Sequence, residues 1–476
     1  MTSSGPLASV PLVVDVDGTL IKTDLLYESA LQYIAQRPLE AWRLVLWMLG
    51  GKSRLKARLA DSVPLDMSTI PLREETVALI RSAQDEGRPV YLASASDERY
   101  VAALAERLGN VTGVFATRPG LNLAGANKAA CLVEAFGSDG FDYVGDMPVD
   151  FPVWKASRNV LAVTHNSGFE RSVLKAFPDA TIVASSRTAA RDVIKAMRPH
   201  QWAKNVLVFL PALAGHEILS GALSSLLAFA CFCAAASSAY IINDLLDLPS
   251  DREHPRKRKR PFAAGRVPIA VGGLLSVFLM SLALGGSLLL PAGFSFVLLC
   301  YVVVTLGYSF VLKRKMVIDV ITLGGLYTIR VLGGVVAVGA AQSRWLLMFC
   351  LFLFLSLAIV KRCSELVMKK NEGKLDVSGR GYTVSDLPVI TALGAAAGYC
   401  AVLVFTMYLN SPEVVALYSH PGRLWLASPL LLYWISRVLM LSGRGELHDD
   451  PVVFALTDRM SWATGAAVAA VVALSI

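Results

Sequence analysis

The pattern of apolar and polar positions changes near residues 185–200. Before that point, short apolar runs such as 10–16 alternate with charged stretches, which is typical of the buried strands and helices of an α/β domain. From Trp202 onward, apolar stretches of about 18 or more residues recur to the end, and that length allows a helix to cross a bilayer. The pattern therefore predicts an α/β domain at 1–185, a linker with an amphipathic segment at 186–202, and an all-α polytopic membrane domain at 203–476.

We expect nine membrane spans in the second part. They lie roughly at 203–219, 221–243, 268–289, 293–312, 317–339, 345–363, 386–409, 424–441 and 458–475. Basic residues gather in the loops after the second, fourth, sixth and eighth spans, whereas the opposite loops hold only Arg344 and Arg423. Because Lys and Arg favour cytoplasmic loops, this bias predicts a multi-pass protein of a bacterial-type inner membrane with its N-terminal domain in the cytoplasm. The first apolar run is too short and too acidic for a signal peptide.

Composition agrees with a membrane protein and argues against a disulfide framework. The 476 residues are 54% hydrophobic and 17% charged, whereas about 25% is charged in an average soluble domain. Mean hydropathy is +0.53. The seven cysteines are scattered and form no Cys-x-x-Cys pair, so we interpret them as apolar residues in a reducing setting. The net charge of +8 is concentrated in loops between apolar stretches, which argues against a nucleic-acid partner.

A carboxylate motif closes the second predicted span. Asp244, Asp247 and Asp251 are spaced three and four residues apart, so on a helix they share one face. Three neighbouring carboxylates repel each other unless a cation binds between them, and Mg²⁺ prefers oxygen ligands that it shares with substrate phosphates. A basic run, 254–261, follows and is suited to phosphate oxygens. The two segments together predict a Mg²⁺-dependent diphosphate site, although the basic run alone could equally be a solvated stop at the membrane.

This motif resembles the hallmark of the UbiA superfamily of membrane prenyltransferases. The resemblance rests on Asn243-Asp-Leu-Leu-Asp-Leu-Pro-Ser-Asp251 followed by His254-Pro-Arg-Lys-Arg-Lys-Arg-Pro261, and it covers about residues 195–476. It implies a bundle of nine helices whose cavity opens toward the cytoplasm and laterally into lipid. It also implies that the three aspartates of the motif bind Mg²⁺.

Cations in the loops after the fourth and sixth predicted spans help to choose between branches of this superfamily. Aromatic prenyltransferases of this superfamily carry a second Asp-x-x-x-Asp motif between spans six and seven, but that loop here is Lys361-Arg-Cys-Ser-Glu-Leu366. A surplus of cations suits a second anionic substrate and resembles the decaprenyl-phosphate phosphoribosyltransferase branch. That branch implies transfer of 5-phosphoribose from phosphoribosyl diphosphate to a polyprenyl phosphate. The alternative is a prenyltransferase that moves an isoprenoid from its diphosphate to an aromatic acceptor, beside a regulatory N-terminal domain.

The candidate substrate-binding residues lie around the predicted cytoplasmic face. For the donor diphosphate they are Asn243, Lys204, Lys257 and Arg260. For the acceptor phosphate or the ribose 5-phosphate they are Lys313, Lys361, Arg362 and Arg380. Further substrate-binding candidates are Asp319, Glu365 and Tyr382. Arg330 lies within a span, where a lone cation needs a partner, so it is also placed at the site. A lipid phosphate is already ionised, so positioning and charge stabilisation would supply most of the rate.

Polar residues follow short buried strands in the N-terminal part. In chain order they are Asp15, Asp17, Ser94, Lys128 (at the start of a helix), Asp146 and Asp150. The carboxyl ends of parallel strands lie at one edge of a sheet, so these side chains should converge there. One carboxylate can then attack phosphorus while the other, two residues on, transfers a proton.

These positions resemble the four motifs of the haloacid dehalogenase-like (HAD) phosphohydrolases, in order. Asp15-Val-Asp-Gly-Thr19 and Gly145-Asp-Met-Pro-Val-Asp150 are the most specific of them, and the resemblance covers about residues 8–180. It implies a Rossmannoid parallel sheet with a small helical cap at about 24–75. It further implies that Asp15 is the nucleophile, Asp17 the acid/base, Ser94 a ligand of a phosphoryl oxygen and Lys128 a neutralising cation. Mg²⁺ would be held by Asp15, Asp146 and the carbonyl group of Asp17, with Asp150 in support.

The predicted cap contains an apolar stretch with two tryptophans, 42–49, followed by the cations Lys52, Arg54, Lys56 and Arg58. This pattern suits either the membrane surface or a helix that faces the core. A phosphoribosyl product would still carry a 5-phosphate, so a fused phosphatase could remove it to give polyprenyl-phosphoryl ribose. A HAD-like domain kept for assembly or regulation is the competing interpretation.

Overall fold

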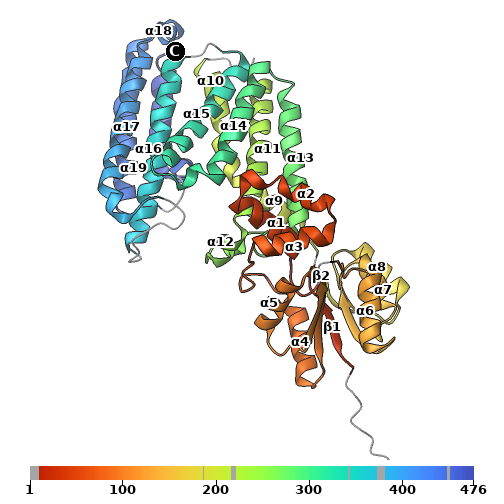
Figure 1. The fold of residues 1–476 in the computed structure, drawn as a ribbon. Helices are drawn as coiled ribbons and strands as arrows, with labels where there is room; N and C mark the ends of the chain where they lie inside the picture. The colour runs from red at the N-terminus through yellow and green to blue at the C-terminus, as the bar shows by residue number, and fades with distance from the viewer. Residues whose placement is uncertain are drawn as a thin grey trace, which may run out of the picture. The chain divides into compact units, whose positions relative to one another are not determined.

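Figure 1 shows the computed structural model of the chain, which describes residues 10–118, 120–185, 187–215, 221–340, 343–371, 381–447 and 451–476. The chain divides into two compact units. The first unit combines residues 1–197 with 240–276, and the second combines 198–239 with 277–476. The first unit thus contains the N-terminal α/β fold together with the aspartate motif and the basic run.

A parallel sheet forms the centre of the first unit. Within the described residues its strands lie in the order β3-β2-β1-β4-β5-β6, and each neighbouring pair is parallel. The strands are β1 (Leu12–Asp15), β2 (Val90–Asp97), β3 (Gly113–Thr117), β4 (Asp142–Gly145), β5 (Asn159–Thr164) and β6 (Thr181–Ser185). The order reverses between β1 and β4, and a crevice at the carboxyl ends of strands is expected at such a switch point. This confirms the predicted α/β architecture.

Nine α-helices accompany the sheet in the described part of residues 10–197. They are α1 (Leu25–Gln36), α2 (Arg43–Leu49), α3 (Lys52–Ser62), α4 (Glu74–Asp85), α5 (Glu98–Leu108), α6 (Ala126–Phe136), α7 (Phe151–Trp154), α8 (Ser167–Ala176) and α9 (Ala190–Ala196). Alternate residues of a strand point to opposite faces, so Leu12 and Val14 join one apolar cluster while Val13 joins the other. Because both faces of β1 are covered, its carboxyl end at Asp15 is buried.

The helices α1, α2 and α3 lie between β1 and β2 in the chain, where the cap was predicted. In α2, Leu44 and Trp47 pack against the core. On its other side, Trp42 is 59% exposed and Leu49 is 80% exposed. Each of the two interpretations of this stretch therefore describes one face of α2, and contact of the exposed face with a membrane stays a prediction.

The apolar part of the chain is helical. Among the described residues, seven helices are long and apolar enough to cross a membrane. They are Ala222–Leu246 (α11), Ile269–Ser287 (α13), Ala292–Phe310 (α14), Ile318–Val338 (α15), Arg344–Asn371 (α16), Val384–Leu409 (a 3-10 turn and α17) and Pro421–Gly443 (a 3-10 turn and α19). Within the second unit, α16 packs against both α15 and α17.

The prediction of nine spans is not confirmed. In place of the first predicted span, the described residues form a 3-10 helix, Pro199–Phe209, and the short α10, Leu210–Ala214. Proline lacks the backbone N–H that a continuous helix needs, and Pro211 stands at the start of α10. The last predicted span is α21, Arg459–Ala473, whose 15 residues are fewer than the roughly 20 that cross a bilayer. Short helices α12 (Leu248–Glu253), α18 (Pro412–Leu417) and α20 (Pro451–Thr457) connect the longer ones.

The 3-10 segment nevertheless packs closely within the second unit. A Cβ atom on Gly334 in α15 would lie 2.1 Å from the carbonyl oxygen of Val208. Glycine is therefore required for this backbone to approach α15, and the approach brings Lys204 and Asn205 of the same segment into buried positions.

Candidate functional sites

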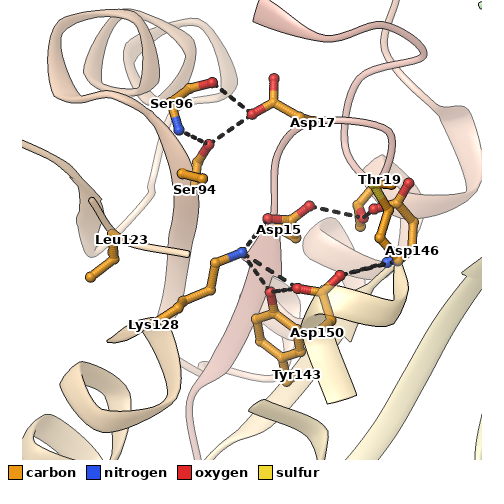
Figure 2. A network of polar contacts seen from close by, with 12 residues as sticks. Asp15, Asp17, Thr19, Ser94, Ser96, Leu123, Lys128, Tyr143, Asp146 and Asp150 are labelled. Atoms are coloured by element: carbon orange, nitrogen blue, oxygen red, sulfur yellow. Dashed lines mark hydrogen bonds and ion pairs between the residues drawn. The ribbon is translucent and has the colours of Figure 1, made fainter. Parts of the chain in front are cut away.

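Figure 2 shows the polar network at the carboxyl end of β1. The Asp15 carboxylate accepts hydrogen bonds from Lys128 Nζ at 2.6 Å and from Thr19 Oγ1 at 3.3 Å. The turn after β1 passes through Gly18 at φ +78°, where a Cβ atom would lie 2.2 Å from Asp146 Oδ2. Glycine is needed here both for the left-handed backbone and for the close approach of Asp146. The predicted convergence of strand ends thus has a specific steric basis.

Asp15, Asp146 and Asp150 form a compact buried group. One oxygen from each carboxylate lies within 4.8 Å of the others. Asp150 Oδ1 accepts a hydrogen bond from Tyr143 Oη at 2.8 Å, and its other oxygen accepts from the Asp146 backbone N–H at 3.2 Å. Mg²⁺ prefers oxygen ligands. The carboxylates of Asp15, Asp146 and Asp150 therefore offer suitable ligands for Mg²⁺ at this edge of the sheet.

The buried charges do not balance at this edge. Burial raises the pKa of Asp15 well above its ordinary value, Lys128 opposes that rise, and the neighbouring aspartates add to it. Burial also raises the pKa of Asp146, against the contact of His165 Nε2 with its carboxylate at 2.6 Å. For Lys128, burial would lower the pKa, but Asp15 and Asp150 more than offset this and raise it. A divalent cation would relieve the excess negative charge.

The Asp17 side chain points away from this carboxylate group and toward β2 (Figure 2). Its Oδ2 accepts hydrogen bonds from Ser94 Oγ at 2.9 Å and from Ser96 Oγ at 2.7 Å. Its Oδ1 accepts from the Leu25 backbone N–H at 2.8 Å. The three donors fix the orientation of Asp17, and Ser94 is bonded to Asp17 rather than facing open space.

Sequence reasoning missed several members of this network. Tyr143 donates to Asp150 and accepts from Lys128 Nζ at 2.9 Å. Thr19 donates toward both Asp15 and Asp146, and Ser96 joins Ser94 on Asp17. The one available signal was position: Tyr143 lies in the strand that leads to Asp146, and Thr19 lies in the Asp15 motif.

A cavity of about 280 Å³ opens from this edge toward the cap helices. Its lining includes Asp15, Asp17 and Lys128 on the sheet side and Lys52 and Lys56 of α3 on the other. Lys56 Nζ donates to the Ala95 carbonyl oxygen at 2.5 Å. Burial lowers the pKa of Lys56, while Asp17 and Asp24 act in the opposite direction. The cavity therefore places cations opposite the acidic edge, as an anionic ligand requires.

The aspartate motif lies at the end of α11 and in α12. Arg260 Nη1 bonds Asp244 Oδ1 at 3.1 Å and Asp251 Oδ2 at 2.6 Å. Asn243 Nδ2 donates to Asp247 Oδ2 at 3.0 Å. Arg260 thus occupies the position between two carboxylates where the sequence predicted a metal ion, and it comes from the basic run that was predicted to bind phosphate.

The motif retains a free acceptor for a cation. Asp251 is 1% exposed, and its Oδ1 is buried without a hydrogen bond among the described residues. Lys257 Nζ is 3.8 Å from that oxygen, which is too long for a hydrogen bond. Among the described residues, Asp244, Asp247 and Asp251 do not bring one oxygen each within 4.8 Å of one another, as Asp15, Asp146 and Asp150 do. The unsatisfied Asp251 oxygen by itself suits Mg²⁺ as a ligand.

Arg330 is a buried cation inside α15. Its Nε donates to Asn205 Oδ1 at 2.7 Å, and Nη2 donates to Tyr301 Oη at 2.9 Å. Its guanidinium carbon is 4.7 Å from the centre of the Tyr301 ring and 5.6 Å from that of Tyr327. Arg330 is therefore held by neutral partners and aromatic rings, and its positive charge is not cancelled by them.

Arg362 has the opposite environment. It is 2% exposed and donates from Nε to Asp319 Oδ2 at 2.7 Å, with a further ion pair to Glu365. Tyr382 donates to the other Asp319 oxygen and accepts from the Val317 backbone N–H at 2.8 Å. Four residues predicted to bind substrate thus bind one another, and their charges are largely compensated within α15, α16 and the segment before α17.

Four further cations were predicted to bind substrate. Lys204 and Lys361 line a small cavity of about 30 Å³ with Tyr327, and Lys204 Nζ is 5.7 Å from the centre of that ring. Lys313 lies in the 3-10 turn Leu312–Arg314 after α14. Arg380 lies outside the described residues.

The apolar helices and the acidic motif at the end of α11 define a polytopic membrane protein with a carboxylate site suited to a cation. Residues 206–465 match the UbiA prenyltransferase family. The chain belongs to this family, and therefore to a family of membrane transferases.

Individual relatives cover different parts of the chain. It is 36% identical to the uncharacterized protein y4nM of Sinorhizobium fredii over 464 residues, which covers 97% of this chain and 90% of that protein. It is 38% identical to the decaprenyl-phosphate phosphoribosyltransferase of Mycolicibacterium smegmatis over 276 residues, 56% of this chain and 87% of that protein. A UbiA homolog from Archaeoglobus fulgidus, solved with DMAPP and Mg²⁺, shares 18% identity at a TM-score of 0.45 and covers 59% of this chain and 98% of that one.

Proposed function

We propose that the membrane domain transfers 5-phosphoribose from phosphoribosyl diphosphate to a polyprenyl phosphate of the decaprenyl type. The observation that carries the proposal is the 38% identity with a decaprenyl-phosphate phosphoribosyltransferase over 276 residues. Buried or partly buried cations in the second unit support it, because Arg330, Lys204 and Lys361 suit a second anionic substrate in addition to the donor.

The reaction at this site would be a displacement at the ribose C1 carbon. An oxygen of the acceptor phosphate forms a bond to C1 while the bond from C1 to the diphosphate oxygen breaks. Asp244, Asp247 and Asp251 would hold Mg²⁺, which would offset the charge of the diphosphate. Lys257 and Arg260 would bind phosphate oxygens, so Arg260 would exchange its bonds to Asp244 and Asp251 for bonds to the donor. The acceptor is already ionised and needs no general base.

We further propose that the α/β domain is a HAD-like phosphatase that removes the 5-phosphate from the transferred ribose. Asp15 would attack phosphorus to form an aspartyl-phosphate, and Asp17 would give its proton to the departing sugar oxygen. Asp17 would then take a proton from the water that hydrolyses the aspartyl-phosphate. Lys128, 2.6 Å from Asp15, would neutralise charge on the transferred group. Mg²⁺ would be held by Asp15, Asp146 and the Asp17 carbonyl, with Asp150 in support, and would stabilise phosphoryl charge.

The proposal assigns one activity to each part of the chain. The phosphatase would occupy 1–185, a linker 186–202, and the transferase 203–476, with both sites on the cytoplasmic side of an inner membrane. The product would be polyprenyl-phosphoryl ribose. The support for orientation is the concentration of Lys and Arg in alternate loops.

Mass spectrometry of lipids made by the purified protein tests both steps. With phosphoribosyl diphosphate, a polyprenyl phosphate and Mg²⁺, we expect polyprenyl-phosphoryl ribose from the unmodified protein and the 5-phosphorylated lipid from Asp15→Asn. Dephosphorylated lipid at equal abundance from Asp15→Asn would refute the phosphatase step. Turnover of radiolabelled prenyl diphosphate with an aromatic acceptor, without turnover of phosphoribosyl diphosphate, would instead establish the prenyltransferase alternative.

A further inference from the structure

A second cavity, of about 370 Å³, opens at the acidic edge of the first unit. Asp17 and Asp146 line both this cavity and the one beneath the cap. Its far wall is formed by a segment from much later in the chain, Gly265 to Ala270, which ends the loop of the aspartate motif and begins α13. The α/β site is therefore bounded in part by the loop between α12 and α13, which also carries the basic run.

That loop is fixed to the α/β fold by specific contacts within the first unit. Arg252 forms a bidentate ion pair with Glu28 of α1, at 2.5 and 3.2 Å, and the two side chains are 5% and 1% exposed. Gly265 has φ +65°, and a Cβ atom there would lie 2.6 Å from Lys22 Cβ. A buried bidentate pair and a contact that only glycine permits show a fitted surface, so the wall at Gly265–Ala270 is a built part of the cavity.

The lining of the cavity combines cations with apolar side chains. Arg73 is 4% exposed, and its guanidinium donates to the carbonyl oxygens of Gly18 at 2.9 Å and Thr19 at 3.2 Å. The Lys22 side chain has no hydrogen-bond or ion-pair partner among the described residues. Pro268, Ile269 and Ala270 supply the apolar wall. Arg266 also lines the cavity and pairs with Asp192 at 3.0 Å.

We propose that this cavity binds the lipid side of the phosphatase substrate, namely the phosphodiester of a polyprenyl-linked phosphosugar and the first carbons of its prenyl chain. The phosphodiester lies near Lys22 and Arg73, and the chain lies along Ile269 and Ala270. The 5-phosphate then reaches Asp15 past Asp17 and Asp146, which are common to both cavities. The proposal rests on the phosphatase function proposed above, and it makes the loop of the transferase motif a specificity element of the phosphatase.

The neighbouring residues Ala270 and Val271 allow a matched test. Ala270 lines the cavity, whereas Val271, which is 38% exposed, does not. Phosphate release by the full-length purified protein is measured with two substrates: the phosphorylated lipid that Asp15→Asn accumulates, and water-soluble ribose 5-phosphate. We expect Ala270→Trp to lower the lipid-to-soluble ratio of kcat/KM by about tenfold, because the indole fills the space beside Pro268 and Ile269. Val271→Trp should leave the ratio unchanged.

A charge substitution provides an independent check. Lys22→Gln should lower the same ratio by about threefold, and Lys22→Arg should restore it, because a phosphodiester needs the cation rather than a particular side-chain length. Ratios that stay at the unmodified value in both Ala270→Trp and Lys22→Gln would overturn the lipid-binding proposal. Absence of hydrolysis of either substrate by the unmodified protein would instead refute the phosphatase function itself.

Discussion

The two aspartate sites of the first unit differ in what holds their carboxylates in place. At the strand ends, Asp15, Asp146 and Asp150 are bound by hydroxyl and backbone donors and by one cation, Lys128. At the end of α11, Asp244 and Asp251 are bridged by Arg260. The first arrangement leaves excess negative charge at the strand ends, and in the second the Arg260 side chain lies between two of the carboxylates. At the strand ends, several neutral donors add to one cation in holding the carboxylates, whereas at the end of α11 one arginine bridges two of them.

The largest expected effect comes from removing one carboxylate at each site separately. Asp146→Asn should lower phosphate release by about a thousandfold and leave lipid-linked transfer unchanged, because it removes a metal ligand only at the strand ends. Asp244→Asn should lower transfer by a similar factor and leave release of phosphate from ribose 5-phosphate unchanged. Both products are measured by mass spectrometry and phosphate assay in one reaction series.

Asp247→Asn is a control for the two substitutions. Asp247 has a neighbouring place in the motif, so Asp247→Asn should resemble Asp244→Asn and not Asp146→Asn. If either substitution abolished both activities in folded protein, the separation into two independent sites would be wrong.

The α/β site was largely predictable from sequence because its aspartates lie at or just after strand ends, while Lys128 lies in the first turn of α6. Asp15, Lys128, Asp146 and Asp150 do meet at one edge, since parallel strands of a doubly wound sheet end at the same edge. The partners that set their geometry were not predictable. Thr19 reaches Asp146 across 127 residues of sequence, so that contact depends on how β1 and β4 pack. Tyr143 reaches Asp150 only seven residues on, but the direction of its hydroxyl depends on the turn after β4.

The helical part was less predictable for a physical reason. Apolar length identifies candidate membrane helices, yet it did not reveal that Pro211 starts a separate short helix after a 3-10 segment. Charge pattern placed Arg362 among phosphate ligands, whereas the structure pairs it with Asp319 and Glu365, which approach it only in the folded bundle. The contact of Glu28 with Arg252 joins residues far apart in sequence and had no local signal.

The ion pair between Glu28 and Arg252 connects α1 of the α/β fold to the loop that carries the second aspartate site. Breaking this pair tests whether the loop depends on the α/β fold. Glu28→Gln leaves Arg252 buried without its counter-charge, and removing one partner of a buried pair costs roughly 3–5 kcal/mol. We expect hydrogen exchange of residues 248–268 to become at least about a hundredfold faster, while exchange in β1 and β4 is unchanged. The pair Glu28→Gln with Arg252→Met should recover part of the protection.

Faster exchange in Glu28→Gln restricted to α1 would contradict a fitted loop. Glu98→Gln is a suitable control, because Glu98 forms an exposed pair with Arg118 and such pairs contribute about 0–1 kcal/mol. Its exchange pattern should match that of the unmodified protein.

Replacing Arg260 tests whether an internal cation stands in for the metal at the second site. In Arg260→Gln, the buried carboxylates of Asp244 and Asp251 lose their shared partner, which should destabilise the protein by roughly 1–3 kcal/mol when Mg²⁺ is chelated. Added Mg²⁺ should restore more thermal stability to Arg260→Gln than to Arg258→Gln, whose arginine is exposed in the same run. Equal Mg²⁺-dependent shifts of Tm in the two variants would show that Arg260 does not occupy a cation position.

The smallest effect is expected at Tyr143, which orients the first site without supplying a charge. Burial, reinforced by Asp150, raises the pKa of Tyr143, so its hydroxyl stays protonated and donates to Asp150. Tyr143→Phe removes this donor but leaves Lys128 3.5 Å from Asp150, and we expect phosphate release to fall about tenfold, which corresponds to one modest hydrogen bond. Tyr91→Phe on the neighbouring strand β2 is the control, because its hydroxyl has no hydrogen-bond partner among the described residues. A fall in phosphate release as large in Tyr143→Phe as in Asp146→Asn would contradict the contrast between the two sites, because the strand-end carboxylates would then depend on one side chain as much as Asp244 and Asp251 depend on Arg260.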